Sequence, residues 1–297
     1  MNRDAFSSYH PIVNLIYFCF VIAFTMIFMH PVCLAISFAA SLVYSVHLNG
    51  AKQIKFNLKY MLPLMLVTAA INPAFNHSGV TILTYLPSGN PLTLESIVYG
   101  FAASLMLINA VNWFSCWNKV MTTDKITYLF GRIIPSLSLI FSMTMRFVPR
   151  FGGQLKKVTN AQKCIGRGIN KGTLKQRLKN GVTIMSIMVT WSLENAVETA
   201  DSMKGRGYGL KGRTAFSIFN FDGRDLAALA FIMCCASAVT AFGIIGKIDF
   251  NYIPAIYGEQ GTDTVIILFL YAAVMFLPSV LNILEKNKWK RLLNSKM

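Results

Sequence analysis

The chain alternates between long stretches without charge and shorter stretches rich in lysine and arginine. Windows that lack Asp, Glu, Lys and Arg run over residues 11–50, 60–94, 96–118, 226–246 and 264–284. Each is at least as long as the ~20 residues that a helix needs to cross hydrocarbon. The first window can hold two helices, with a break expected at His30-Pro31 because proline disfavours helical geometry in the preceding residue. The pattern therefore predicts about six transmembrane helices.

The composition supports an all-α integral membrane protein. The chain is 54% hydrophobic and only 13% charged, with a mean hydropathy of +0.50, which is too apolar for ordinary soluble material. The first apolar run is too long for a signal-peptide core, so we expect it to remain as the first span. The six cysteines form no C-x-x-C pair and the four histidines stand singly. We expect no metal site and no cofactor.

The middle of the chain has a different pattern, with polar positions recurring on helices that remain strongly apolar on one side. We expect three helices here: a short one over residues 123–132, and long amphipathic ones over 136–165 and from 174 to a Gly-Arg-Gly tripeptide at residues 205–207. This divides the chain into N-terminal transmembrane helices (1–121), a region of amphipathic helices at the cytoplasmic face of the membrane (122–213), and a C-terminal transmembrane hairpin with a basic tail (214–297).

Positive charge is concentrated in alternate connections. The formal net charge is +16, and residues 146–213 hold 14 Lys or Arg against three acids. Lys52, Lys55 and Lys59 fall in what we expect to be the connection between the second and third spans, whereas residues 72–91 have no Lys or Arg. By the positive-inside rule we expect a multi-pass protein of the cell membrane with both termini and the central region in the cytoplasm. Many of these cations are expected to contact membrane lipids.

Two Gly-Arg-Gly tripeptides, each at the end of a long amphipathic helix, are the most specific local signal. They are Gly166-Arg167-Gly168 and Gly205-Arg206-Gly207, and their arginines are 39 positions apart. A helix cap explains one such tripeptide, because glycine favours the left-handed position and a cation suits the last turn. We expect the two arginines to occupy the same slot at their helix tips, exposed for a forked contact with a partner carboxylate.

These motifs resemble a known family. The segments MTMRFVPRF, AQKCIGRG and ENAVETADSMKGRGYG, followed by Gly212-Arg213-Thr214, are similar to the transmembrane (T) component of energy-coupling factor transporters, EcfT, and to the related CbiQ proteins of cobalt uptake. The similarity covers about residues 122–219. The family's short motifs are usually written Ala-Arg-Gly, whereas both tripeptides here begin with glycine, a departure that loosens the helix end but keeps the arginine.

The resemblance implies a non-catalytic scaffold. It would couple two cytoplasmic ABC-type ATPases, each gripping one Gly-Arg-Gly motif, to a substrate-binding S component for uptake of a vitamin or a metal ion. We expect the apolar face of the last long helix to contact the S component, through Val182, Met185, Val189, Ala196 and Met203. Because selection belongs to the S component in this family, the imported substrate is not specified by this chain.

The residues also bear on the alternatives. No G-x-x-x-x-G-K-[ST] loop is present, so nucleotide binding of the P-loop kind is not expected. A membrane-embedded enzyme acting on a lipid-linked substrate is the alternative function, with Glu194, Glu198 and Asp201 on one helical face as its best candidates. Gly-Arg-Gly also occurs in RNA-binding segments, but those are poor in apolar residues, so we expect no nucleic-acid partner.

Overall fold

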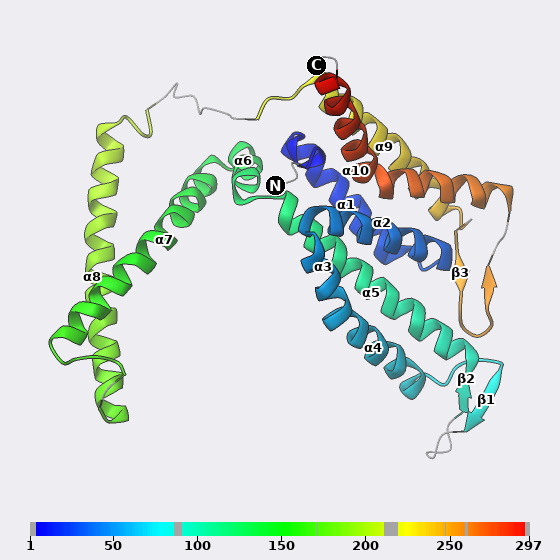
Figure 1. Ribbon diagram of the computed structural model, residues 1–297, viewed down its shortest axis with the longest axis horizontal. Coiled ribbons are helices and arrows are strands. Elements are labelled where there is room, and N and C mark those ends of the chain that lie inside the picture. Colours follow the sequence, from blue (N-terminus) through cyan, green and yellow to red (C-terminus); the bar gives the residue numbers. More distant parts are fainter. Residues whose placement is uncertain are drawn as a thin grey trace. The chain divides into compact units, whose positions relative to one another are not determined.

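The computed structural model describes residues 4–85, 91–170, 172–210, 219–246, 248–258 and 261–294. The chain divides into two compact units. Residues Met1–Ile126 and Phe219–Met297 form the first, called here the membrane unit, and Thr127–Ile218 forms the second, called here the hairpin unit. The chain leaves the membrane unit within one short helix and returns to it for the last two helices (Figure 1).

The membrane unit is built from apolar helices and two small β-hairpins. The helices are α1 (Pro11–Ile27), α2 (Pro31–Asn49), α3 (Ala51–Phe56), α4 (Leu62–Phe75), α5 (Leu94–Val120), α9 (Gly223–Ile244) and α10 (Thr262–Asn294). A 3-10 turn η1 (Phe6–Ser8) precedes them and a π-helical turn η2 (Asn57–Met61) joins α3 to α4. The antiparallel pairs β1 (Ile82–Tyr85) with β2 (Pro91–Thr93) and β3 (Phe250–Asn251) with β4 (Tyr257–Gly258) lie between helices.

The expected membrane spans are present. Among the described residues, five helices are long and apolar enough to cross a membrane, and α1 is a shorter apolar helix of 17 residues. The expected break of the first apolar window is confirmed, because α1 ends at Ile27 and α2 begins at Pro31. The His30 Nδ1 atom accepts the backbone N–H of Val32 at 3.3 Å, which caps α2, while the proline at its first position lacks an N–H that would need a partner.

One expected connection is much shorter than predicted. Lys52, Lys55 and Lys59 were expected in a connection between spans, but they lie within helix, because α3, η2 and α4 run on as one helical segment, Ala51–Phe75. The turn between α2 and this segment is the single residue Gly50, whose left-handed φ of 64° reverses the chain. The positive charge is therefore carried on the first turns of a span rather than on a loop.

Aromatic side chains fill the centre of the membrane unit. Trp113 of α5 is fully buried and donates from Nε1 to Ser37 Oγ of α2 at 3.0 Å. Tyr17 of α1, also fully buried, donates its hydroxyl to the carbonyl of Met275 in α10 at 3.2 Å. Both rings are buried with their polar atoms hydrogen-bonded. They therefore link α1, α2, α5 and α10 without leaving these two polar atoms unsatisfied.

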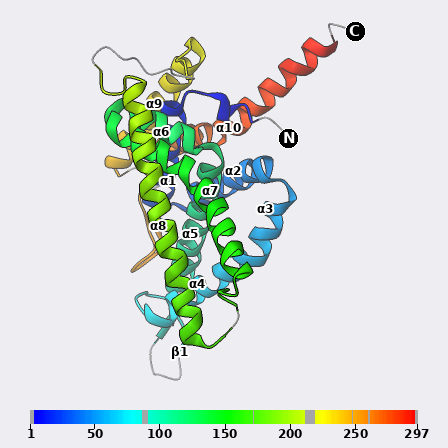
Figure 2. The same cartoon turned by 90° about the vertical axis from the view of Figure 1, so that its left-hand side faces the viewer.

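The hairpin unit consists of long antiparallel helices that follow a short linking helix. The linker is α6 (Thr123–Ile133), and the long pair are α7 (Pro135–Cys164) and α8 (Leu174–Gly205), which lie side by side (Figure 1 and Figure 2). Helix α7 continues unbroken through Pro149. The Trp191 ring of α8 meets Phe151 of α7 edge-on, with centroids 5.9 Å apart. The buried positions Ile184, Met188 and Asn195 share the face of Trp191, so this face of α8 packs on α7.

Candidate docking motifs at the two ends of the hairpin

The first Gly-Arg-Gly follows the end of α7 in a regular cap. Gly166 has a left-handed φ of 79°, and its N–H bonds to the carbonyl of Lys163 at 3.1 Å. The N–H of Arg167 reaches back to the carbonyl of Gln162 at 2.8 Å. These two bonds form a Schellman motif, in which the left-handed residue is almost always glycine because a Cβ there is strained.

The second Gly-Arg-Gly ends α8 in the same kind of cap. Here Gly207 is the left-handed residue, with a φ of 72°, and its N–H bonds to the carbonyl of Lys204 at 2.9 Å. The N–H of Tyr208 bonds to the carbonyl of Met203 at 3.1 Å. Gly205 is the last helical residue and Arg206 is the C-cap.

The two arginines therefore do not share a slot, which corrects the expectation from the sequence. Arg206 is the C-cap of α8, whereas Arg167 stands two positions later relative to its own helix, after the left-handed glycine. The first glycine is the left-handed one in the first motif, and the last glycine is the left-handed one in the second. The two tripeptides have the same sequence but occupy different positions relative to their helix caps, because each cap is defined by its left-handed glycine. We call this difference the shifted cap frame.

The loop after the first motif is fastened to the start of α8. Asn180 donates from Nδ2 to the carbonyl of Gly168 at 3.2 Å, and Arg177 donates from Nε to the carbonyl of Ile169 at 2.7 Å. Thr173 and Gln176 form a reciprocal capping box at the helix start. These bonds hold the loop on the C-terminal side of Arg167, and the cap of α7 holds the backbone on its N-terminal side.

These contacts also show how far apart the two motifs lie along α8. Gly168 lies beside Asn180, and Arg206 follows Asn180 by 26 positions along α8. At 1.5 Å per residue this is about 39 Å along the axis of α8. Because the hairpin is antiparallel, one motif lies at each end of it. Two partners can therefore bind the two motifs without competing for space.

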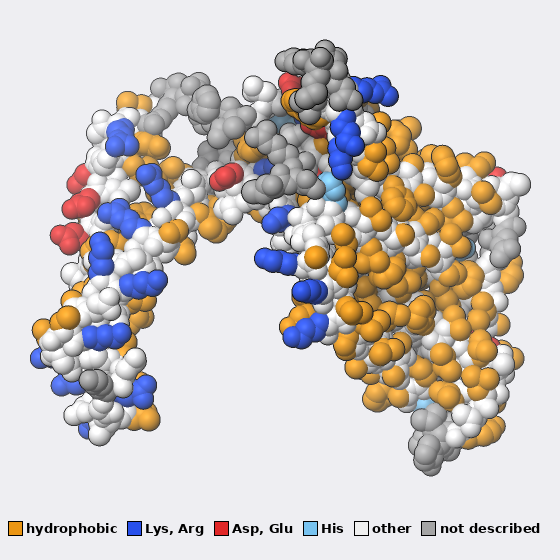
Figure 3. Space-filling view, in the orientation of Figure 1, with side chains coloured by type: hydrophobic (Ala, Val, Ile, Leu, Met, Phe, Trp, Pro, Cys, Tyr) orange, Lys and Arg blue, Asp and Glu red, His pale blue; other side chains and the backbone are white. Residues whose placement is uncertain are grey.

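Basic side chains adjoin both motifs. Arg167 and Arg206 are exposed, as are Lys163 and Lys204 in the last turns of their helices. Basic side chains are spread over the visible face of the hairpin unit, while apolar side chains dominate that of the membrane unit (Figure 3). Among the described residues, no group of three or more His, Cys, Asp or Glu could hold a metal ion. The Gly212-Arg213-Thr214 segment singled out in the sequence lies outside the described residues.

A continuous apolar stripe covers the outer face of α8. Val182, Met185 and Val189 have exposed fractions of 69%, 64% and 56%, Ala196 is exposed, and Met203 is half-buried. The structure adds exposed neighbours that the sequence did not single out for contact: Leu174, Leu178, Leu193 and Val197. The stripe is separate from the face that packs on α7, so the amphipathic pattern of α8 contains two apolar faces rather than one wide one.

A buried lysine was missed in the sequence. Lys125 in the first turns of α6 is only 6% exposed, and its Nζ donates to the carbonyl of Ser7 at 2.6 Å. With the Asn14 amide oriented so that its nitrogen donates to the carbonyl of Phe6, its oxygen accepts from Lys125 Nζ at 2.8 Å. Burial lowers the pKa of Lys125 to about 8, against the opposing attraction of Asp4. The bonds anchor α6 to the N-terminal segment of the membrane unit, where the chain departs for the hairpin.

Nothing in the local sequence distinguishes Lys125 from an exposed lysine. It follows Asp124 in a short amphipathic helix, where a solvated charge is the usual outcome. Its burial arises from η1, which returns over the first turn of α6 from a distance of 118 residues. Only the tertiary arrangement reveals it.

The fold and motifs define a class: a multi-span helical membrane protein that carries an amphipathic helical hairpin with a capped arginine at each end. The family model described as "Cobalt transport protein", CbiQ, matches residues 8–216. The chain belongs to the CbiQ family, and the resemblance expected from the sequence is confirmed.

Curated relatives agree with the family. The chain is 32% identical over 110 residues to the energy-coupling factor transporter transmembrane protein EcfT of Lactobacillus helveticus, a match covering 37% of this chain and 40% of the relative. It is 28% identical to EcfT 1 of Listeria monocytogenes over 65% of this chain and 77% of the relative. It is 25% identical to EcfT of Bacillus selenitireducens over 72% of this chain and 82% of the relative.

Proposed function

We propose that this chain is the EcfT-type coupling component of an energy-coupling factor transporter. In this role it makes no catalytic contribution of its own. It joins two ABC-type ATPases in the cytoplasm to an S component in the membrane, and so transmits ATP-driven motion for the uptake of a vitamin or a metal ion. Both termini and the hairpin unit are then on the cytoplasmic side, as the basic segments favour.

The observation that carries the proposal is the placement of Arg167 and Arg206 at opposite ends of one helical hairpin. An exposed guanidinium can make a bidentate bond with a carboxylate. About 39 Å of helix lies between Arg206 and Asn180, which bonds to the loop of the first motif, and this gives each ATPase its own contact. A continuous helix of 32 residues transmits displacement of one end to the other because its backbone is bonded throughout.

The outer stripe of α8 supplies a second contact in the proposal. An exposed row of apolar side chains on a helix that already packs on α7 needs a further apolar surface. The S component is the membrane-embedded partner expected of this family, and we assign the stripe formed by Val182, Met185, Val189, Ala196 and Met203 to it. Movement of the hairpin ends would then reach the S component directly through α8.

The test is co-purification of the chain with two ABC-type ATPases. The variants are Arg167→Glu, Arg206→Glu and both together, with Lys179→Glu, an exposed cation within α8, as the control for charge reversal. Loss of one partner of a desolvated charge pair costs about 2 to 5 kcal/mol, so each single variant should weaken one ATPase contact and the double variant both. Retention of both ATPases at normal stoichiometry by the double variant refutes the proposal.

A further inference from the structure

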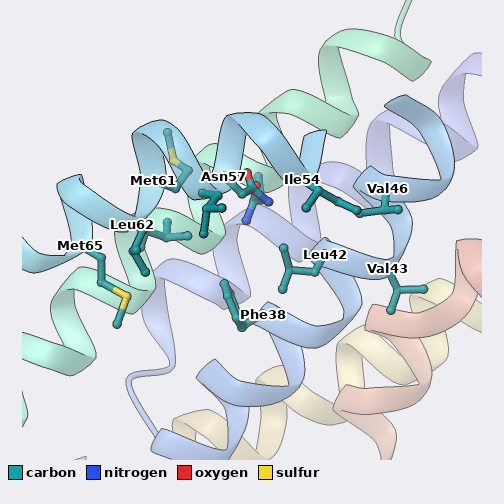
Figure 4. Close-up of a pocket in the computed structure, with 12 residues that line it drawn as sticks. Phe38, Leu42, Val43, Val46, Ile54, Asn57, Met61, Leu62 and Met65 are labelled. Atoms are coloured by element: carbon teal, nitrogen blue, oxygen red, sulfur yellow. The ribbon is translucent and has the colours of Figure 1, made fainter. Parts of the chain in front are cut away.

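Two cavities in the membrane unit lie along α2, α3 and α5. The first, called here the apolar groove, encloses about 590 Å³. In Figure 4 the side chains of Phe38 and Leu42 on α2 stand opposite Asn57 and Leu62 on the α3–η2–α4 segment. Ile108 and Asn112 of α5 complete its lining. The volume is within the range of about 300 to 1,000 Å³ that small-molecule sites occupy.

Two amide nitrogens of residues that line the apolar groove have no hydrogen-bond partner among the described residues. Gln53 donates from Nε2 to Asn57 Oδ1 at 3.2 Å and to Asn112 Oδ1 at 3.4 Å, so the amide oxygens are engaged. The Nδ2 atoms of Asn57 and Asn112 are buried and have no partner among the described residues. Asn112 is fully buried. A buried donor without an acceptor is unfavourable, so an acceptor oxygen supplied by a ligand would stabilise this amide network.

The second cavity begins on the other side of the same amides. It encloses about 570 Å³ and is lined by Gln53, Ser115, Lys52 and Lys119 among others. Gln53 bonds to both asparagines of the apolar groove and also lines this basic cavity. Both lysines are exposed at the ends of apolar helices, where cations meet lipid headgroups.

We propose that the apolar groove and the basic cavity together bind one anionic glycerophospholipid. The protein presents an apolar groove, then two amide donors, then two cations. A phospholipid presents an acyl chain, then ester carbonyl oxygens, then a phosphate in the same order. The acyl chain lies between Phe38, Leu42 and Ile108, the ester oxygens accept from Asn57 and Asn112, and Lys52 and Lys119 neutralise the phosphate.

The chemistry favours a lipid over a helix of a partner protein. A transmembrane helix satisfies its own backbone carbonyls, so it brings few free acceptors to the two amides. An ester carbonyl has no internal donor. The outer edge of the groove is formed by Val43, Ile54 and Leu58, which are 52%, 54% and 67% exposed, so an acyl chain can enter from the bilayer. Asn57 also opens the π-helical turn, and such turns are frequent at functional sites.

The test is native mass spectrometry of the full chain in detergent, with bound lipid counted after addition of phosphatidylglycerol, phosphatidylcholine with the same acyl chains, or soluble glycerol phosphate. We expect the unaltered chain to bind phosphatidylglycerol about 30-fold more tightly than the double variant with Lys52→Gln and Lys119→Gln. Each cation near the headgroup contributes about 1 kcal/mol. Lys286→Gln with Lys288→Gln, exposed cations of α10, is the matched control and should bind as the unaltered chain does.

A second pair of variants tests the groove itself. Ile54→Trp fills the groove from an exposed position, and Ile71→Trp, 50% exposed on α4 outside the lining, is its control. Ile54→Trp should abolish retention while Ile71→Trp retains lipid, and matching elution on gel filtration verifies folding. Equal retention of the two lipids, equal behaviour of the two tryptophan variants, or competition by glycerol phosphate alone overturns the proposal. The proposal is also overturned if Ile54→Trp loses a co-purifying partner protein while lipid retention is unchanged, because a protein helix would then occupy the groove.

Discussion

Gly166 and Gly207 occupy the same position in their helix caps, with left-handed φ values of 79° and 72°. Their equivalence places Arg167 after the left-handed residue and Arg206 before it. The related family motif begins with alanine, whereas both tripeptides here begin with glycine. An alanine in place of that first glycine is expected to have a different effect at each site. At Gly205 an alanine fits the last helical turn, since a Cβ there meets nothing within 4 Å. At Gly166 an alanine requires an unfavourable backbone.

This difference predicts opposite effects of one substitution. Gly166→Ala places a Cβ at a left-handed position and should cost about 1 to 2 kcal/mol. Gly205→Ala should gain about 0.5 to 1 kcal/mol of helix propensity. Hydrogen exchange of the cap amides measures both. The Arg167 amide should exchange about 5- to 30-fold faster in Gly166→Ala, and the Arg206 amide should slow in Gly205→Ala. Equal effects at the two sites would contradict the shifted cap frame.

The loop contact of Asn180 predicts a graded effect on ATPase binding. Asn180→Ala removes the bond to the carbonyl of Gly168 and releases the loop that follows Arg167. One such bond is worth about 0.5 to 1.5 kcal/mol, so affinity for the ATPase at the first motif should fall about 2- to 13-fold. Binding at Arg206 should be unchanged because it lies at the far end of α8.

The control is Asn160→Ala, an exposed amide on α7. Affinities for the two ATPases, measured separately by titration, check the prediction. A loss at both motifs, or a loss as large as that of Arg167→Glu, would show that Asn180 supports the whole hairpin rather than the first motif.

The buried Lys125 predicts a pH dependence of stability. Its pKa is lowered to about 8 in the folded chain from the ordinary 10.5, so between these values the unfolded chain binds more protons. Stability therefore rises with pH across this window and falls as pH drops toward 8. Relative to Lys125→Met, the unaltered chain should gain thermal stability as pH increases. Lys286→Met, at an exposed site, controls for loss of a lysine, and a gap to Lys125→Met that does not change with pH contradicts the prediction.

The helices could be predicted because their signals are local. Uncharged windows of sufficient length give the spans, and His30-Pro31 separates α1 from α2 by the chemistry of two adjacent residues. The connection at Lys52, Lys55 and Lys59 was wrongly predicted, because charge alone does not distinguish a loop from the exposed first turns of a span.

The site was predictable in part. The two Gly-Arg-Gly tripeptides could be found because they terminate long amphipathic patterns, but the cap frame depends on which glycine takes the left-handed conformation. The unpartnered amides of Asn57 and Asn112 could not be predicted, since they depend on a bond from Gln53 to Asn112, which is 59 positions away. Hydrogen bonds between distant elements leave no periodic trace in the sequence.

Two adjacent residues of α8 predict contrasting phenotypes, because Val189 is 56% exposed on the outer stripe and Met188 is 1% exposed on the face that packs on α7. Val189→Asp should leave the chain folded, since exposed substitutions usually change stability by less than ~0.5 kcal/mol, but should prevent association with the S component by placing a charge in an apolar contact. Met188→Ala should cost about 2 to 5 kcal/mol of packing and loosen α7 from α8. Co-purification with the S component and protease resistance of the hairpin separate the two. If Val189→Asp retains the S component while Met188→Ala loses it, the outer stripe is not the contact, and association depends on the integrity of the hairpin alone.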